Sequence, residues 1–159
     1  MIYSKTCEYA IRSLIYFAEH PEKKMATVKE ISKDSGVPSA YIAKIFQCLV
    51  RGKILVSERG PKGGYSLSEP ASKLTVLKIV HSLDDLSKSP FSNCVMGLDK
   101  CNNKNPCPLH NIWAEAKDKM LLKLASSSIA DVAALGNKFK WGKQRRFFLS
   151  KRMRGMFSI

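Results

Sequence analysis

The stretch from Thr27 to Glu69, "TVKEISKDSGVPSAYIAKIFQCLVRGKILVSERGPKGGYSLSE", constrains the fold more than any other part of the chain. Thr27 followed by Glu30 predicts a capping box at the start of a short helix, and Gly36 predicts its end. After a tight turn, Ser39 is expected to cap a second helix. Its apolar residues recur at helical spacing: Ile42, Ile45, Phe46, Leu49 and Val50. Two helices joined by a short glycine turn predict a helix-turn-helix.

The residues after this second helix predict a β-hairpin. "ILVSE" and "YSLSE" have strand composition, and "RGPKGG" between them is a Gly-Pro turn. A hairpin directly after the second helix is a wing. The predicted fold class is therefore mainly α, a winged helix-turn-helix domain with a small β-hairpin wing.

A long helix is expected from Pro108 to about Ser126, with Pro108 as its first residue. One stripe of this helix is apolar: Leu109, Ile112, Trp113, Ala116, Met120 and Leu124. Such a stripe outside a small domain needs a partner surface, and a second copy of the chain is the simplest one. We therefore expect a dimerisation helix and a homodimer, the alternative being that the stripe packs on its own domain.

These expectations divide the chain into four segments. Residues 1–83 form the DNA-binding domain, with helices expected at 5–19 and 75–83. Residues 84–107 form a linker and a cysteine loop, and residues 108–135 form the long helix and a short capped helix. Residues 136–159 form a basic tail with eight lysines and arginines and no acid.

The charge of the chain points to a polyanionic partner. Its 27 basic and 13 acidic residues give a net charge of +14, which favours nucleic acid or an anionic membrane surface. The tail interleaves basic and bulky apolar residues, which suits either contact, and the alternative is a solvated terminus. No apolar run is long enough for a membrane span, and no signal peptide precedes the domain, so we expect a cytoplasmic protein with reduced thiols.

In a winged helix, the exposed face of the second helix enters the major groove of double-stranded DNA. The candidates for DNA contact on that helix are Ser39, Ala40, Tyr41, Lys44, Gln47 and Arg51. Lys44 and Gln47 are the candidates for base contact. At the wing the candidates are Arg59, Lys62 and Gly63, where glycines let the backbone approach a phosphate. The alternatives are a solvated helix face and a plain hairpin.

Three of the five cysteines and one histidine lie in "CVMGLDKCNNKNPCPLH", residues 94–110. Gaps of six and five residues separate Cys94, Cys101 and Cys107, wider than the short knuckles usual in structural zinc sites. Wide gaps favour an iron–sulfur cluster. A helix starting at Pro108 would put Cys107 at its N-terminus, where a thiolate is stabilised. A zinc site, a thiol switch and an inert loop stay open, as does an electron carrier. Cys107 with His110 lacks the companions that catalysis needs, so no enzyme is expected.

Three features resemble the IscR/NsrR-type family of transcription regulators: the wing "RGPKGGY", the opening "CEYAIRSLIYFA", and three cysteines before a long helix. The resemblance covers about residues 1–135. It implies a homodimer with a palindromic operator, whose DNA affinity is controlled by a labile iron–sulfur cluster, [2Fe–2S] or alternatively [4Fe–4S]. It also implies that Cys94, Cys101 and Cys107 bind the cluster. The fourth ligand is His110 or Glu8 donated by the partner subunit, and the resemblance leaves both open.

Overall fold

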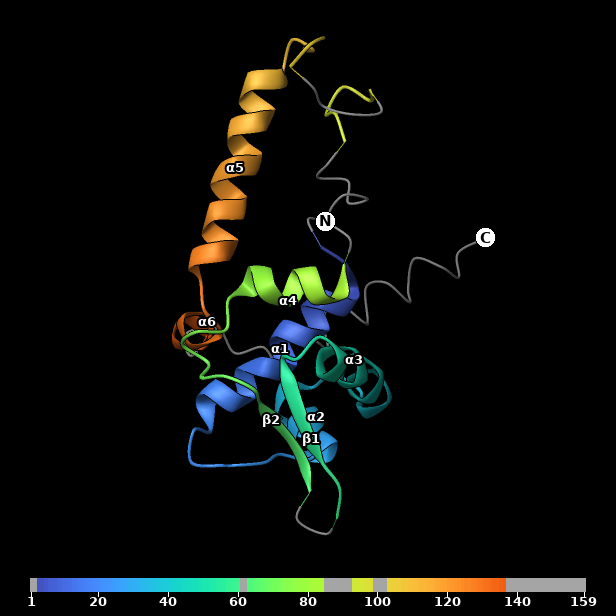
Figure 1. The fold of residues 1–159 in the computed structure, drawn as a ribbon, viewed down its shortest axis with the longest axis vertical. Helices are drawn as coiled ribbons and strands as arrows, with labels where there is room; N and C mark the ends of the chain where they lie inside the picture. Colours follow the sequence, from blue (N-terminus) through green and yellow to red (C-terminus); the bar gives the residue numbers. More distant parts are fainter. Residues whose placement is uncertain (1–2, 61–62, 85–92, 99–102, 137–159) are drawn as a thin grey trace, which may run out of the picture.

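The computed structural model describes residues 3–60, 63–84, 93–98 and 103–136, so the predictions for Lys62, Cys101 and the tail beyond 136 lie outside them. These residues form a mainly helical fold with a two-stranded antiparallel sheet (Figure 1). The elements in chain order are α1 (Lys5–Glu19), α2 (Val28–Ser35), α3 (Ser39–Arg51), β1 (Leu55–Glu58), β2 (Gly64–Leu67), α4 (Val76–Leu83), α5 (His110–Ser126) and α6 (Ile129–Gly136). No helix in the described part is long and apolar enough to cross a membrane.

The helix-turn-helix forms as predicted at α2 and α3, with one correction. The capping box is present, and Gly36 ends α2 in the left-handed conformation with a φ of 62°. The prediction that Ser39 caps α3 was wrong. Pro38 occupies the cap position, so no side chain caps α3 and Ser39 is its first helical residue. The carbonyl of Pro38 accepts the backbone N–H of Tyr41 at 3.0 Å, which closes the first turn instead.

The hydrophobic core lies between α1, α3, α4 and the hairpin. Four residues of the predicted inner face of α3 are buried: Ile42, Ile45, Phe46 and Leu49. The fifth, Val50, is half-buried. Phe46 packs between Phe17 of α1 and Tyr65 of β2, with ring centroids 6.4 and 5.0 Å away. Burial of aromatic rings contributes much of the stability of so small a core. Helix α3 is thereby held by aromatic contacts to α1 and to β2.

The wing is the hairpin of β1 and β2, paired from Leu55 opposite Leu67 to Glu58 opposite Gly64. Ala26, just before α2, adds an isolated bridge to Tyr65, with both N–H to O distances at 2.9 Å. A Cβ on Gly64 would lie 2.6 Å from the Ala26 carbonyl oxygen, so only glycine permits this approach. The base of the wing is therefore held against the helix-turn-helix.

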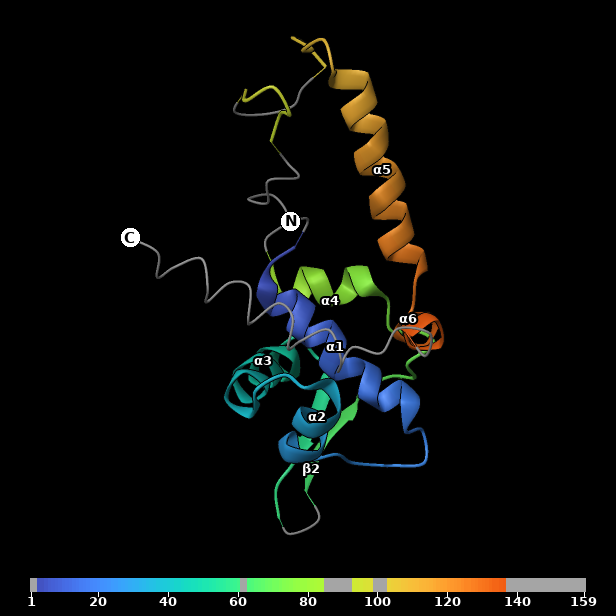
Figure 2. The same cartoon turned by 180° about the vertical axis from the view of Figure 1, so that it is seen from behind.

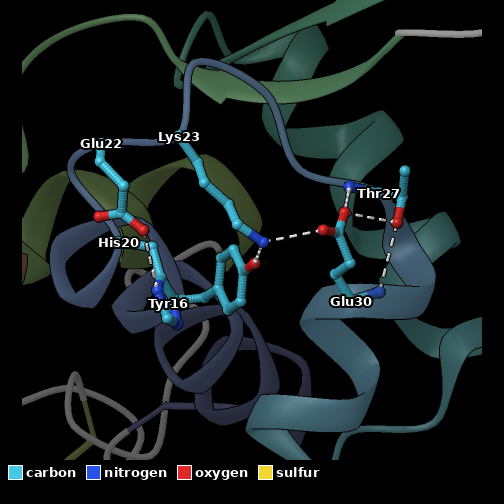
Figure 3. A network of polar contacts seen from close by, with 6 residues as sticks. All are labelled: Tyr16, His20, Glu22, Lys23, Thr27 and Glu30. Atoms are coloured by element: carbon cyan, nitrogen blue, oxygen red, sulfur yellow. Dashed lines mark hydrogen bonds and ion pairs between the residues drawn. The ribbon is translucent and has the colours of Figure 1, made fainter.

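A polar network closes the loop between α1 and α2 (Figure 3). The Lys23 ammonium donates to the Tyr16 hydroxyl at 2.8 Å and to the Glu30 carboxylate at 2.9 Å. The same carboxylate accepts from the Thr27 backbone N–H at 2.8 Å. One lysine thus joins the end of α1 to the capping box of α2.

Helix α5 leaves the domain and carries the cysteine segments at its far end (Figures 1 and 2). It begins at His110, so the prediction that Pro108 is its first residue was wrong. The backbone N–H of His110 donates to the Cys107 carbonyl at 2.9 Å, and this turn precedes the helix. Cys107 therefore lies outside the first helical turn. Of the α5 side chains, His110 alone is fully buried.

The corner between α5 and α6 is attached to the winged-helix domain. The backbone N–H of Val76 donates to the Ser127 carbonyl, and that of Ile129 donates to the Leu74 carbonyl, each at 2.9 Å. Ser128 and Asp131 cap α6 reciprocally, with the Ser128 N–H 2.9 Å from the carboxylate. Helix α6 then packs on α1.

Candidate functional site

The side chains predicted to contact DNA lie on the exposed face of α3, opposite the core. All six are exposed, and the large ring of Tyr41 is 57% exposed. Tyr9 of α1 contacts that ring edge-on, with centroids 5.7 Å apart, so Tyr41 has one fixed neighbour. Arg51 reaches back to the Cys48 sulfur at 3.2 Å. The structure thus brings these six residues together on one surface.

The wing residues differ in how far the structure describes them. Arg59 directly follows the last residue of β1 and is exposed, whereas Gly63 is half-buried. A Cβ on Gly63 would lie 2.3 Å from the Glu58 carbonyl oxygen, so the turn itself requires glycine there. This steric need accounts for Gly63 without any contact to DNA.

The cysteine loop brings two of its predicted ligands together at the end of α5. The sulfur atoms of Cys94 and Cys107 lie 3.5 Å apart. Cys94 is buried, with 7% of its surface exposed, and Cys107 is half-buried. The two cysteines are 13 positions apart in the sequence, so their contact joins residues 93–98 to the turn that precedes α5.

His110 and Glu8, the two candidates for the fourth ligand, lie apart. The His110 ring is buried, and its Nε2 lies 2.6 Å from the Asn103 side-chain oxygen. Glu8 is in the first turn of α1, where its carboxylate pairs with Lys5 at 2.5 Å and with Arg12 at 3.5 Å. Within the described residues, no three histidine, cysteine or acidic side chains form a metal-binding group.

The electrostatic surroundings of Cys94 favour its thiolate. The hydrogen bond with the Met96 backbone is the largest influence and lowers the pKa of the Cys94 thiol below its ordinary value. The positive charge of Lys117 acts in the same direction. A thiolate is the form that binds metals and reacts with oxidants.

Two residues beside the thiol pair were not among the predicted site residues. The indole Nε1–H of Trp113 donates to the backbone carbonyl of Asn93 at 3.0 Å, next to Cys94. Asn103 contacts the His110 ring. Trp113 follows His110 by three residues, so helical spacing predicts that the two side chains are about one turn apart. The sequence carries no signal that the Asn93 carbonyl accepts the indole N–H.

The other two cysteines, Cys7 and Cys48, lie on α1 and α3 rather than in the cysteine loop. Cys7 is fully buried, and this burial, with a hydrogen bond to Asp84, raises the pKa of its thiol to about 12. Asp84 also accepts the backbone N–H of Ser4 at 2.7 Å, which ties the start of α1 to the end of α4. Cys48 is half-buried on α3.

Comparison with known proteins identifies the family. Residues 3–135 match Rrf2, described as an iron-dependent transcriptional regulator. The chain belongs to the Rrf2 family. This Rrf2 chain is 30% identical over 140 residues to a putative HTH-type transcriptional regulator of Aquifex aeolicus, covering 87% of this chain and 95% of the relative. It is 26% identical over 124 residues to the HTH-type transcriptional regulator IscR of Photorhabdus laumondii, covering 78% and 74% of the two chains.

Solved structures show the same fold. The Rrf2 chain superposes on CymR, the global cysteine regulator of B. subtilis, with a TM-score of 0.70 and 19% identity, covering 85% of this chain and 98% of CymR. It superposes on T. potens IscR with a TM-score of 0.67 and 18% identity, covering 92% and 96%. The predicted winged-helix fold and family are therefore confirmed. The protein is a DNA-binding transcriptional regulator, and its relatives are named regulators rather than enzymes.

Proposed function

We propose that this Rrf2 protein is a cytoplasmic, homodimeric regulator whose affinity for a palindromic DNA operator is controlled by a labile iron–sulfur cluster. Cys94, Cys101 and Cys107 hold the cluster, which is [2Fe–2S] or alternatively [4Fe–4S]. His110 of the same chain, or the partner subunit's Glu8, completes the ligand set. The supporting observation is the pair of thiols at the end of α5.

The thiol pair fits two ligands of one metal ion. Two thiolates on one tetrahedral ion lie about 3.8 Å apart, given metal–sulfur bonds of about 2.3 Å. The observed separation of 3.5 Å is close to that value. When bound, a cluster with one non-thiolate ligand supplies a redox-active centre that is easily lost, which suits a sensor. The chain supplies the paired thiols and the connection to the DNA-binding domain.

One connection runs along α5. Any shift of the cysteine segments is passed down this helix to the Ser127–Ile129 corner. There two backbone hydrogen bonds of 2.9 Å hold the start of α4. Helix α4 packs against α3, so displacement at the cysteine segments reaches the recognition helix through contiguous contacts.

A second connection starts at Glu8. Its carboxylate pairs with Arg12, whose guanidinium also donates to the Ser35 carbonyl at 3.0 Å, at the end of α2. If a cluster in one subunit binds the partner subunit's Glu8, then the carboxylate that positions Arg12 is withdrawn. The turn before the recognition helix then responds directly to cluster binding.

The test of cluster binding is purification without oxygen, followed by an absorption spectrum and assays of iron and sulfide. We expect a coloured protein with iron and sulfide in equal amounts. Its affinity for an operator selected from random DNA should change when the cluster is removed. A colourless protein with stoichiometric zinc would contradict the proposal, as would a coloured protein that binds no DNA.

Dimers that combine two different variant chains identify the fourth ligand. If the partner subunit's Glu8 is the ligand, homodimers of Glu8→Gln and of Cys94→Ser both lose the cluster. Mixing the two chains then restores one intact site per dimer. If His110 is the ligand, the Glu8→Gln homodimer keeps its cluster and the His110→Ala homodimer loses it. Retention in both single variants would rule out both candidates.

The separation of the sulfur atoms also favours a second candidate function, a thiol switch. Cys94 and Cys107 are close enough to form a disulfide after a small movement, since the S–S bond is about 2.05 Å. Each pair would release two protons and give two electrons to an oxidant such as glutathione disulfide. Reversible oxidation that changes DNA affinity in metal-free protein supports this candidate. Unchanged affinity after complete oxidation excludes it.

A further inference from the structure

The two cysteine-bearing segments need a contact that holds them together. Cys107 is joined to α5 by the turn that precedes the helix, whereas Cys94 lies 13 positions earlier, among the described residues 93–98. That segment is closed on itself, since the Cys94 N–H donates to the Leu98 carbonyl at 3.3 Å. Its internal bonds therefore do not explain why Cys94 lies beside Cys107.

Trp113 makes a contact of the required kind. Its indole N–H donates to the Asn93 carbonyl at 3.0 Å, across 20 residues of sequence. Asn93 is the residue next to Cys94, so the bond fixes the backbone that carries the thiol. Trp113 lies in the first turn of α5, which directly follows the turn that carries Cys107. The contact therefore joins the two halves of the thiol pair.

The position of the indole ring is itself restricted. Lys117, one turn further along α5, places its ammonium over the ring at 6.0 Å from the centroid. Such a cation–π contact favours a ring plane that keeps one face toward Lys117. The ring itself is half-buried, whereas the acceptor residue Asn93 is exposed.

We propose that Trp113 is a positioning residue that brings Cys94 to Cys107 before any metal or oxidant arrives. The inference rests on the proposed function only in that the two thiols act as a pair. It applies equally to cluster assembly and to disulfide formation. In chemical terms, Trp113 raises the effective concentration of one thiol at the other.

The test measures that effective concentration in metal-free protein. Protein with Cys101→Ser, which leaves two thiols in the loop, is equilibrated in mixtures of reduced and oxidised glutathione. In the reaction, two thiols and one glutathione disulfide give one protein disulfide and two glutathione thiols. Peptide mapping quantifies the Cys94–Cys107 disulfide. Trp113→Phe retains the aromatic packing and removes the N–H donor. We expect its equilibrium constant to fall about fivefold, the scale of one neutral hydrogen bond.

Trp141→Phe is the matched control, because it makes the same substitution at the only other tryptophan. Its equilibrium constant should equal that of the Cys101→Ser parent. An unchanged constant in Trp113→Phe would overturn the inference. If the constant falls but no variant ever binds a cluster, the cluster proposal fails and the positioning role stands. The two failures are therefore distinguishable.

A second measurement needs no Trp113 variant. In ¹⁵N-labelled metal-free protein, the Trp113 indole N–H should exchange with solvent more slowly than a free indole, because it is hydrogen-bonded. Signals are assigned with Trp141→Phe. An exchange rate equal to that of a free indole would contradict the inference, whatever the stability of Trp113→Phe.

Discussion

At the scale of single residues, the end of the recognition helix carries an avoidable strain. Lys53 has a φ of 56°, in the left-handed region that costs an L-residue about 1–2 kcal/mol. Its exposed side chain is not needed for this turn, which is closed by the Ile54 N–H donating to the Leu49 carbonyl at 2.9 Å. Lys53→Gly removes this strain. Glycine also raises the conformational entropy of the unfolded chain, which destabilises the fold by about 0.4–1 kcal/mol. We expect a net stabilisation of about 0.5–1 kcal/mol.

Urea unfolding measures this effect as a higher midpoint at an unchanged slope. Gly36→Ala provides the opposite control, because Gly36 has a φ of 62° and alanine would be strained there. That variant should lose about 1 kcal/mol. Equal or lower stability of Lys53→Gly would mean that the lysine side chain stabilises the turn by more than its backbone strain.

Residue-level predictions from sequence succeeded where the signal was local. The capping box at Thr27 and the left-handed Gly36 depend on residues within one helical turn, and both are present. The cap at Ser39 failed because its neighbour Pro38 took the cap position with a backbone already in the extended range. Ser39 is therefore the first helical residue, and an N-cap needs a non-helical backbone from which its side chain reaches the free N–H groups.

At the scale of elements, the capping box of α2 makes stability depend on pH. A hydrogen bond from Lys23, followed by those from Thr27, lowers the pKa of the Glu30 carboxyl from 4.5 to about 2. A lowered folded-state pKa means that the ionised form stabilises the fold. This stabilisation is complete above pH 4.5 and is lost as pH falls from 4.5 to about 2.

We therefore expect Glu30→Gln to flatten the decline of melting temperature over that pH window, as followed by circular dichroism. Glu22→Gln is the control, since the Glu22 carboxylate pairs only with His20, at 3.4 Å, among the contacts in Figure 3. Its profile should follow the wild type. A Glu30→Gln profile as steep as the wild type would show that other carboxylates dominate acid unfolding.

The exposed face of α3 leads to a separate prediction, about how the protein distinguishes DNA sequences. Lys44 is exposed near the middle of that face, so Lys44→Ala should cost about 1–3 kcal/mol at the selected operator and relax the preference at one base position. Lys73→Ala removes the same charge from an exposed position outside α3 and should leave the preference intact. Fluorescence anisotropy at fixed salt, with operator variants, measures both. Uniform weakening on all DNA would instead make Lys44 a phosphate contact.

Elements were predictable from sequence because helix spacing, caps and Gly-Pro turns are local signals. The α5 boundary shifted from Pro108 to His110 because a turn at residues 107–110 forms before the helix. The contact of Trp113 with Asn93 was not predictable, because its acceptor is a backbone carbonyl brought near by the fold. The resemblance implied that Cys94 and Cys107 lie near each other, but not that their sulfur atoms are 3.5 Å apart.

At the scale of the whole molecule, α5 exposes large apolar side chains that nothing in the described part of the chain covers. The side chains of Ile112 and Leu122, on the helix that leaves the domain, are each 70% exposed. Ile112 belongs to the sequence-predicted stripe, whereas Leu122 lies outside it. Of the other stripe residues, Trp113, Met120 and Leu124 are half-buried. Exposed apolar side chains along one helix are typical of an interface between subunits.

We expect Leu122→Glu to convert a dimer to a monomer of 17.8 kDa, as measured by light scattering after size exclusion. A charge in a helix–helix interface is costly, whereas on a solvated face it is nearly neutral, so the fold of the monomer should persist. Leu135→Glu is the matched control, because this α6 leucine is 71% exposed and lies outside α5. It should remain a dimer. Operator affinity should fall only in Leu122→Glu, since a monomer engages one half-site at a time. A dimeric Leu122→Glu would place the subunit interface elsewhere.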